Sequence, residues 1–280
     1  MDFQDLINGL FPSLKGNIYA KIRLGIAYQL ISIGKSQFFR DSIHILLYGI
    51  PGTGKTHILK FVSNIPGSLY VNAQTTTIPG LYGYPDRKVG FVHGTISKVN
   101  NILCIDELDK ANKTFKNSLN ELLEDLKVTI EKAKVDVSYD VNLAVLAAAN
   151  PRKDFFESKN YLDELDLPGT VIDRLDLIFL LNRSFGSHTE ETYTFDNNEL
   201  LNYLNTVRSI NVQVPENIRV NLNISYTGLY FTGRRVNTII RLAKAIARSY
   251  GDNIVKEQYI EEALKYFISV ANPLLGYASY

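Results

Sequence analysis

The sequence is poor in the residues that mark several classes of protein. It has one cysteine, Cys104, among 280 residues, so no disulfide can form within the chain and nothing suggests secretion. The four histidines are scattered and give, with that cysteine, no zinc-binding spacing. No apolar run reaches the ~18 residues of a membrane span. Because the N-terminal "MDFQDL" also lacks a signal-peptide pattern, we expect an intracellular protein without a membrane contact.

An excess of charge of either sign is missing as well. Lys and Arg number 30 against 29 Asp and Glu, which gives a net charge of +1. This balance argues against a protein that coats nucleic acid by bulk positive charge, so any such contact must come from a local patch. The hydrophobic content of 45% and the charged content of 21% are typical of a globular protein. The length suits one large domain, or a large and a small one.

Strand-like and helix-like segments alternate over the first two thirds of the chain. Predicted helices cover 1–40, 56–65 and 113–126, and short apolar strands cover 43–49, 68–73, 100–107, 143–150 and 176–181. A β-hairpin is predicted at about 127–141. Residues 75–90 are polar and interrupted by Gly and Pro, so we expect them to be irregular. The alternation predicts an α/β fold with a mostly parallel sheet covered by helices on both faces.

The composition changes near residue 185. Residues 185–199 are polar and almost without core residues, which predicts a linker. Beyond them, helical patterns cover 200–210, 234–250 and 256–271. We therefore expect a core domain over 1–184 and a small helical domain over 200–280.

The segment "GIPGTGKT" (49–56) matches the phosphate-binding pattern G-x-x-x-x-G-K-[ST], between a predicted strand and a predicted helix. Its glycines let backbone amides close round phosphates, Lys55 reaches the β- and γ-phosphates, and Thr56 offers a hydroxyl to Mg²⁺. We expect ATP and Mg²⁺ as ligands. The predicted nucleotide-binding residues are Gly49, Pro51, Gly52, Thr53, Gly54, Lys55, Thr56 and His57.

Two later strands end in polar residues that suit the same site. "ILCIDE" (102–107) places Asp106 where it can hold Mg²⁺, with Thr56, and Glu107 where it can activate the attacking water. "AVLAAANP" (144–151) ends in Asn150, whose amide can position the water and the γ-phosphate. Alone, the acidic pair would be an ordinary strand end and Asn150 a turn cap before proline. Together with the phosphate loop, both favour the functional interpretation.

Two arginines are candidates for contacts with a phosphate. Arg174 precedes the last predicted strand, where it either pairs with Asp173 or Asp176 at the surface or acts as an arginine finger on a neighbouring subunit's ATP. Arg234 or Arg235 begins a helix, against the helix dipole, and therefore needs another reason to be there. A γ-phosphate would be such a reason.

These elements, in this order, resemble the AAA+ ATPases, and the chain is similar to the motor domain of the MCM replicative helicases. The segments that carry the resemblance are "FPSLKGN" (11–17), "CIDELDK" (104–110), "VTIEKAK" (128–134), "LAAANPR" (146–152), "RLDLIFLL" (174–181) and "IIRLAKAIAR" (239–248). The resemblance implies an AAA+ nucleotide-binding core with a helical lid. It also implies a ring, expected to be a homohexamer, in which Arg174 and Arg234 act on the adjacent subunit's nucleotide.

The same resemblance gives the basic residues of two loops a role. Lys132 and Ala133 match a Lys-Ala pair that touches DNA in the central channel of MCM motors, and Lys134 stands where glycine is usual. Arg87 and Lys88 lie in the expected helix-2 insert, about 78–90. We expect these five residues to contact DNA, most simply a single strand. The alternative is that they are only the solvated tips of hairpins.

The resemblance has limits and competitors. It covers the motor domain, not the N-terminal oligonucleotide-binding and zinc modules or the C-terminal winged helix of MCM proteins, and any loading partner stays unknown. "GTGKT" is the generic ATPase loop, where MCM proteins usually have Ala and Ser. A protein-remodelling ATPase similar to the MoxR group and a nucleotide-controlled scaffold remain alternatives to a DNA helicase or translocase.

Overall fold

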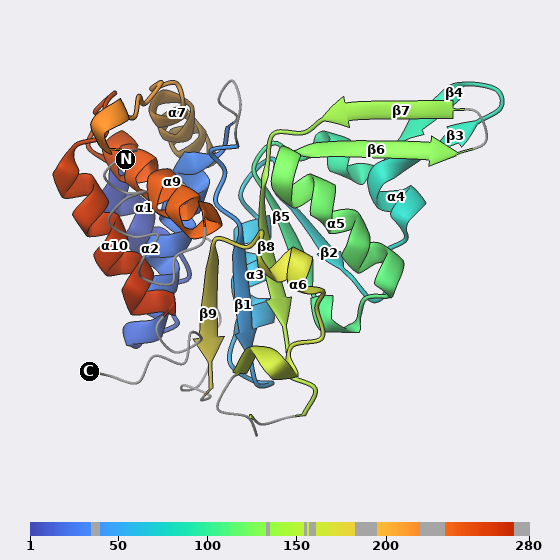
Figure 1. Ribbon diagram of the computed structural model, residues 1–280, viewed down its shortest axis with the longest axis horizontal. Coiled ribbons are helices and arrows are strands. Elements are labelled where there is room, and N and C mark those ends of the chain that lie inside the picture. Colours follow the sequence, from blue (N-terminus) through green and yellow to red (C-terminus); the bar gives the residue numbers. More distant parts are fainter. Residues whose placement is uncertain are drawn as a thin grey trace.

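Five parallel strands form the centre of the molecule (Figure 1). The computed structural model describes residues 1–34, 40–132, 135–153, 156, 161–182, 195–218 and 233–271. The strands are β1 (Ile45–Gly49), β2 (Leu69–Asn72), β5 (Ile102–Asp106), β8 (Ala144–Ala149) and β9 (Leu177–Leu181), in the order β2-β5-β8-β1-β9. The predicted α/β fold with a parallel sheet between helices is confirmed.

The sheet is apolar on both faces, which is why its strands are continuous apolar runs. Successive side chains of a strand point to opposite faces. In β1, Ile45 and Leu47 belong to one core cluster, while Leu46 and Tyr48 belong to the other. All residues of β1, β5, β8 and β9 are buried. Each face therefore requires its own cover of helices.

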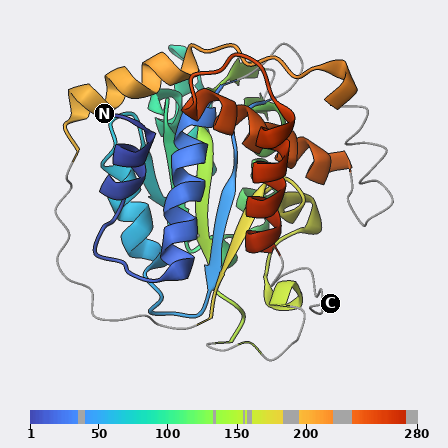
Figure 2. The same cartoon turned by 90° about the vertical axis from the view of Figure 1, so that its left-hand side faces the viewer.

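One face is covered by helices from both ends of the chain (Figure 2). They are α1 (Phe3–Gly9), α2 (Asn17–Ser32), α3 (Lys55–Ser63), α7 (Asn197–Arg208), α9 (Gly233–Ser249) and α10 (Glu257–Ala271). The predicted helix over 1–40 is wrong, because the first helix ends at Gly9 and α2 begins at Asn17. Phe11 (φ 30°) and Gly16 (φ 116°) between them have backbone angles that no α-helix contains.

The other face is covered by shorter elements. They are α4 (Ile78–Tyr82), α5 (Lys113–Asp125), α6 (Gly169–Ile172) and the 3₁₀ turns η1 (Thr95–Lys98), η2 (Leu108–Lys110) and η3 (Tyr161–Glu164). The amphipathic helix predicted at 113–126 is α5, which buries Leu119, Leu122 and Leu123. Asn112 caps its start by accepting a hydrogen bond from the Phe115 amide.

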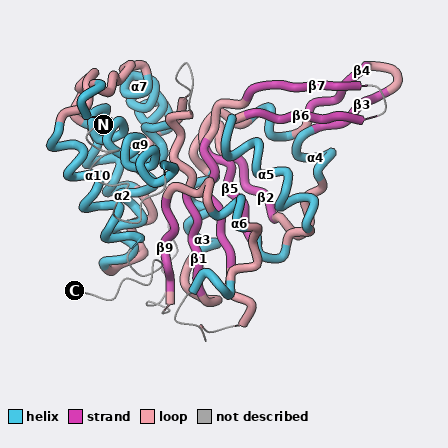
Figure 3. The backbone as a smooth tube through the Cα atoms, in the orientation of Figure 1, coloured by secondary structure: helices cyan, strands magenta, loops and turns pink. Residues whose placement is uncertain are grey.

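Two β-hairpins extend from this side of the molecule (Figures 1 and 3). One joins β3 (Gly83–Asp86) to β4 (Gly90–His93), and the other joins β6 (Lys127–Lys132) to β7 (Val135–Asp140). The prediction that 75–90 is irregular is wrong, since these residues form α4, β3 and the turn into β4. Thr77 caps α4, and Gly90 supplies the positive φ of 83° at the turn.

The two hairpins pack on one another through aromatic side chains. The hydroxyl of Tyr139 in β7 donates to the carbonyl oxygen of Tyr82, which ends α4. The Tyr139 ring also lies 5.1 Å from that of His93 and 6.4 Å from that of Phe91, both in β4. These edge-to-face contacts join residues far apart in sequence, so the hairpins lie side by side.

The C-terminal helices share the core of the first face instead of standing apart from it. Val236 and Ile239 of α9 lie in the same cluster as Ile22 of α2 and Phe179 of β9. The linker predicted over 185–199 falls partly on residues outside the described ranges. Its last residues are helical, because α7 begins at Asn197 after the Asp196 cap. Within the described ranges, no helix is long and apolar enough to cross a membrane.

Candidate nucleotide-binding site

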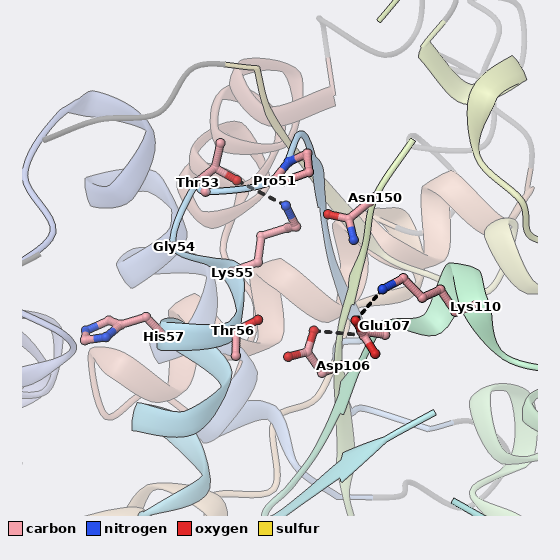
Figure 4. A pocket seen from close by; sticks show the side chains of 11 residues that line it. Pro51, Thr53, Gly54, Lys55, Thr56, His57, Asp106, Glu107, Lys110 and Asn150 are labelled. Carbon is pink, nitrogen blue, oxygen red and sulfur yellow. Dashed lines mark hydrogen bonds and ion pairs between the residues drawn. The ribbon is translucent and has the colours of Figure 1, made fainter. Parts of the chain in front are cut away.

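A cavity of about 460 Å³ lies at the carboxyl ends of β1, β5 and β8, where parallel α/β sheets place their ligands (Figure 4). Its lining residues are Pro51, Gly52, Thr53, Gly54, Lys55, Thr56, His57, Asp106, Glu107, Lys110 and Asn150. The phosphate loop, the acidic pair and Asn150, predicted separately from three segments, are thus brought together by the fold.

The phosphate loop is shaped to receive an anion. Gly52 and Gly54 both have φ of 77°, the left-handed conformation that favours glycine. Gly54 is the N-cap of α3, and no side chain caps this helix start. The first amides of a helix have no partner within it, and the helix dipole favours negative charge at this end. The loop therefore offers backbone donors to a phosphate.

Lys55 is buried at the floor of this loop. Its ammonium group donates to the carbonyl oxygens of Gly49 and Ile50, each at 2.7 Å, and to Thr53 Oγ1 at 3.2 Å. Burial lowers the pKa of Lys55 from 10.5 to about 8, although the nearby Asp106 and Asp109 act in the opposite direction. A bound polyanion would favour the charged amine and would therefore raise the pKa of Lys55 again.

Gly49 does not line the cavity, unlike the other predicted nucleotide-binding residues. A Cβ atom on Gly49 would lie 2.0 Å from the carbonyl oxygen of Leu181 in β9, so only glycine allows the two strands to approach this closely. Its carbonyl nonetheless holds Lys55. The loop is also fixed from α2, because the hydroxyl of Tyr19 donates to the Thr53 carbonyl at 2.9 Å.

Asp106 ends β5, and its side chain lies beside that of Thr56 (Figure 4). One of its oxygens accepts from the Glu107 amide at 2.9 Å and the other from the Tyr70 hydroxyl at 2.8 Å. Both bonds fix the carboxylate and leave lone pairs for a further ligand. Burial raises the pKa of Tyr70, and so does its bond to Asp106. The hydroxyl therefore stays a donor.

Glu107 has a strained backbone and a tethered side chain. Its φ of 54° lies in the left-handed region, which non-glycine residues seldom occupy. Its carboxylate accepts from the Asn72 amide at 2.8 Å and forms an ion pair with Lys110 (Figure 4). The bonds to Lys110 and Asn72 lower the pKa of Glu107, so it is a carboxylate at neutral pH.

Asn150 follows β8 directly, and its side chain points into the cavity beside Lys110 and Glu107 (Figure 4). Its backbone amide donates to Asp109 Oδ1 at 2.9 Å, which ties the end of β8 to the turn after β5. The amide group of Asn150 thus faces the space between the phosphate loop and Glu107. His57, by contrast, extends to the side of α3 away from Asp106 (Figure 4).

The two predicted arginines lie outside the cavity, and both contact Glu124 of α5. Arg174 and Arg234 do not line the cavity. Glu124 Oε2 lies 2.8 Å from Arg174 Nε and 3.4 Å from Arg234 Nη2. We call these three residues the arginine surface. Arg235, the other arginine at the start of α9, lies over the Phe267 ring at 5.9 Å.

The residues predicted to contact DNA lie on the two hairpins. Arg87 and Lys88 are exposed in the turn between β3 and β4. Lys132 is the last residue of β6 and pairs with Val135. Ala133 and Lys134, which complete the predicted Lys-Ala-Lys tip, lie outside the described residues. The strand after this hairpin is β8, so only residues 141–143 separate the hairpin from the strand that Asn150 follows.

The donor set suits a magnesium nucleotide. Thr56 and Asp106 present a hydroxyl and a carboxylate to the same space, and Mg²⁺ is usually held by one or two such oxygens plus waters and phosphates. The uncapped start of α3 and the buried ammonium of Lys55 suit the phosphates. Among the described residues, no group of three or more His, Cys, Asp or Glu side chains forms a self-sufficient metal site.

Several residues of the site have no motif of their own. Asn72 and Tyr70 belong to β2, which pairs with β5 in register Asn72↔Asp106. Polar side chains at the carboxyl end of a predicted parallel strand were a usable signal for them. Lys110 lay within the "CIDELDK" segment. Glu124, on the polar face of an amphipathic helix, carried no local signal at all.

The chain matches a known family over most of its length. The model of the MCM P-loop domain matches residues 2–194. The curated relatives include the DNA replication licensing factor MCM4 of Drosophila melanogaster, 29% identical over 305 residues, which covers 92% of this chain and 35% of the relative. The mcm4 of Schizosaccharomyces pombe is 27% identical over 317 residues, covering 93% of this chain and 34% of the relative.

A further relative is more similar over a shorter stretch. The mcm4-A of Xenopus laevis is 33% identical over 194 residues, 63% of this chain and 23% of that protein. The chain spans about a third of the length of the relatives that it matches almost throughout. The resemblance read from the motifs is therefore confirmed for the domain.

Proposed function

The chain belongs to the MCM P-loop domain family, and we propose that it is an ATP-hydrolysing motor that acts on DNA as a ring of subunits. One observation carries this proposal. Lys55, Asp106, Glu107 and Asn150 surround one cavity, whereas Arg174 and Arg234 lie together outside it. A site for hydrolysis and a separate pair of arginines are what a nucleotide shared between two subunits needs.

The residues of the cavity divide the chemistry of hydrolysis among them. Lys55 and the amides at the start of α3 bind the phosphates, and Thr56 and Asp106 hold Mg²⁺, which neutralises charge on the phosphate oxygens. Glu107 orients a water and takes up its proton as the water oxygen bonds to the terminal phosphorus and the bond to the leaving diphosphate breaks. Asn150 positions that water.

A second copy of the chain supplies the positive charge that the nucleotide site needs at the terminal phosphate. The side chains of Arg174 and Arg234 are 18% and 43% exposed, and they contact Glu124 of α5 instead of lining their own cavity. An arginine from a neighbour that meets the terminal phosphate stabilises the charge of the transition state. Repetition of one such head-to-tail contact closes a ring when the rotation permits. We propose a ring of six.

The two hairpins are the parts that we propose to hold DNA in the channel of the ring. Arg87 and Lys88 on one hairpin and Lys132, Ala133 and Lys134 on the other would contact phosphates of a single strand. Because β7 leads into β8, a movement of Asn150 on hydrolysis would be passed to the hairpin. The packing of Tyr139 on the β4 hairpin would move both hairpins together.

The names of the relatives suggest the setting. They are DNA replication licensing factors, and we propose a replicative helicase or translocase role inside the cell for this chain, together with a loading partner that is still to be identified. The MCM match and the basic hairpin tips favour DNA over a protein substrate of the MoxR-like kind. The carboxylate of Glu107 in the cavity favours hydrolysis over a role as a scaffold that only binds ATP.

DNA-stimulated ATPase activity tests this function. At a protein concentration at which rings form, single-stranded DNA should raise the hydrolysis rate at low salt. Lys132→Ala combined with Lys134→Ala should abolish the stimulation and leave basal hydrolysis near that of the wild type. Lys60→Ala with Lys265→Ala, two exposed lysines on α3 and α10, removes the same charge and should keep the stimulation. A wild-type rate that DNA does not change would contradict the motor.

A further inference from the structure

Glu124 is the residue on which both arginines of the arginine surface converge. It lies near the end of α5, is 42% exposed, and approaches the two guanidinium groups with the same oxygen, Oε2. Arg174 comes from the turn after α6, and Arg234 from the start of α9, some sixty positions further along the chain. No other residue within the described ranges forms an ion pair with either arginine.

The buried acid Asp176 holds two side chains that in turn bind the backbone carbonyls of the two arginines. Asp176 accepts from Arg40, Arg241 and Thr238 at 2.7–2.9 Å. Arg40 also donates to the carbonyl of Arg174 at 2.9 Å, and Thr238 donates to that of Arg234 at 3.2 Å. Burial alone would raise the pKa of Asp176, but Arg40 and Arg241 hold it well below its usual range. The acid is therefore charged.

The guanidinium groups of the two arginines, in contrast, are held at Glu124 by ion pairs that another anion could replace. Arg174 Nε is buried and makes no hydrogen bond of good geometry among the described residues, although it lies 2.8 Å from Glu124. Arg174 Nη1 donates to the Thr170 carbonyl at 2.7 Å and to Asn120 Oδ1 at 3.4 Å. Glu124 and Arg234 are 42% and 43% exposed, and an ion pair that water reaches on one side and that lacks aligned hydrogen bonds is weak. The guanidinium groups can thus leave Glu124 for a stronger anion.

We infer that Glu124 is a positioning residue that presents Arg174 and Arg234, as one unit, to the terminal phosphate of a nucleotide bound to a second copy of this chain. The inference rests on the proposed function. Two arginines at one acid would otherwise repel each other, and Arg234 also opposes the dipole of α9. The carboxylate offsets both effects and keeps the two guanidinium groups within reach of a single point.

The physical consequence is a preorganised pair. A terminal phosphate carries more negative charge than a carboxylate and offers three oxygens. Because Glu124 already holds the two guanidinium groups close together, both can bind the same phosphate with little rearrangement. Without Glu124, Arg174 would keep only the hydrogen bonds of its Nη1 and Arg234 would lose its ion pair, so the two guanidinium groups would no longer be held at one point. The nucleotide of the same subunit would be unaffected, because its cavity does not contain Glu124.

Glu124→Gln tests this inference, with Asp125→Asn as the matched control, an exposed acid next to it on α5. Glu124→Gln should lower kcat for ATP hydrolysis about 10- to 100-fold, the cost of a misplaced catalytic group, and change KM for ATP by less than about twofold. Asp125→Asn should keep the wild-type kcat. Glu124→Asp retains the charge and should recover part of the rate.

Two further measurements separate positioning from a purely structural effect. Added to the double variant Arg174→Ala with Arg234→Ala, Glu124→Gln should cost no further kcat, because Glu124 acts only through these two arginines. Glu124→Gln subunits mixed with Glu107→Ala subunits should recover hydrolysis, since the latter supply an intact arginine surface. A wild-type kcat in Glu124→Gln, or a loss of kcat that mixing never restores, would overturn the inference.

The failure of the inference can be told from that of the proposed function. If Arg174→Ala subunits mixed with Glu107→Ala subunits recover activity while Glu124→Gln behaves as the wild type, the shared site stands and the role of Glu124 is wrong. If the Arg174→Ala mixture does not recover, the shared site itself is wrong, and the inference falls with it.

Discussion

The nucleotide cavity and the arginine surface hold their positive charges in opposite ways. Lys55 is buried and bonded to backbone carbonyls of its own loop. Arg174 and Arg234 are held at one partly exposed carboxylate on another element. The cavity gathers its predicted residues within a single chain, whereas the two arginines are held together outside it. Under the proposed function, nucleotide binding belongs to one subunit and hydrolysis to two.

The largest expected effect concerns the arginine surface. Arg174→Ala should lower kcat by about 10³- to 10⁵-fold, the range found for arginine fingers, because the neighbour's phosphate loses its partner. Nucleotide affinity should stay near that of the wild type, since Arg174 lies outside its own cavity. Steady-state hydrolysis and fluorescent-nucleotide titration measure the two quantities.

Arg174→Lys is the control that separates charge from geometry. A lysine keeps the positive charge but lacks the planar fork that pairs with phosphate oxygens, so it should recover only a small part of the rate. A weaker nucleotide affinity in Arg174→Ala would mean that Arg174 contacts the nucleotide of its own subunit. It would contradict the separation of the cavity from the arginine surface.

The next effect concerns the cavity. Glu107→Gln keeps the shape of the side chain and its bond from Asn72 but removes the base, so kcat should fall about 10²- to 10⁴-fold. The dissociation constant for ATP should not rise, because Lys55 and the loop amides still hold the phosphates. Isothermal titration with this variant gives that constant without turnover. Affinity lost along with activity would mean that Glu107 mainly supports the structure.

The smallest effect is a pH dependence of binding. Burial lowers the pKa of Lys55 to about 8, so the amine of the free chain loses its charge as the pH rises through 8. Bound phosphates favour the charged amine and raise its pKa, and binding above pH 8 therefore takes up a proton. Affinity for ATP should fall by up to about tenfold per pH unit between pH 8 and 10, because binding takes up at most one proton at Lys55.

Calorimetry in buffers of different ionisation enthalpy measures this proton uptake directly. Lys55→Met lacks the amine and should show weak binding with no such slope. An affinity of the wild type that is constant from pH 7 to 10 would contradict the buried, partly neutral state assigned to Lys55.

The same contrast explains what the sequence predicts and what it does not. The cavity was predictable because each part is a local pattern at a strand end: "GIPGTGKT", "ILCIDE" and "AVLAAANP" follow apolar runs, and parallel strands bring their carboxyl ends together. Asn72 and Tyr70 lie at the carboxyl end of β2 and obey the same rule, but they belong to no motif that would single them out.

The arginine surface was predictable only in part. Arg174 and Arg234 were candidates from their places before a strand and at a helix start, but their convergence on Glu124 depends on how α5, α6 and α9 pack. No local pattern encodes such packing. The hairpin at 83–93 was missed for another reason, because Gly and Pro residues that suggest an irregular loop in sequence here make the N-terminus of α4 and a tight turn.

The most direct test of the shared site is a mixing experiment. Arg174→Ala subunits keep an intact cavity, and Glu107→Ala subunits keep an intact arginine surface, while each alone should hydrolyse almost no ATP. Mixed at a concentration at which rings form, they should recover hydrolysis, because some interfaces then pair a good cavity with a good surface. Activity that never exceeds the sum of the two separate variants would contradict a nucleotide site completed by a second copy of the chain.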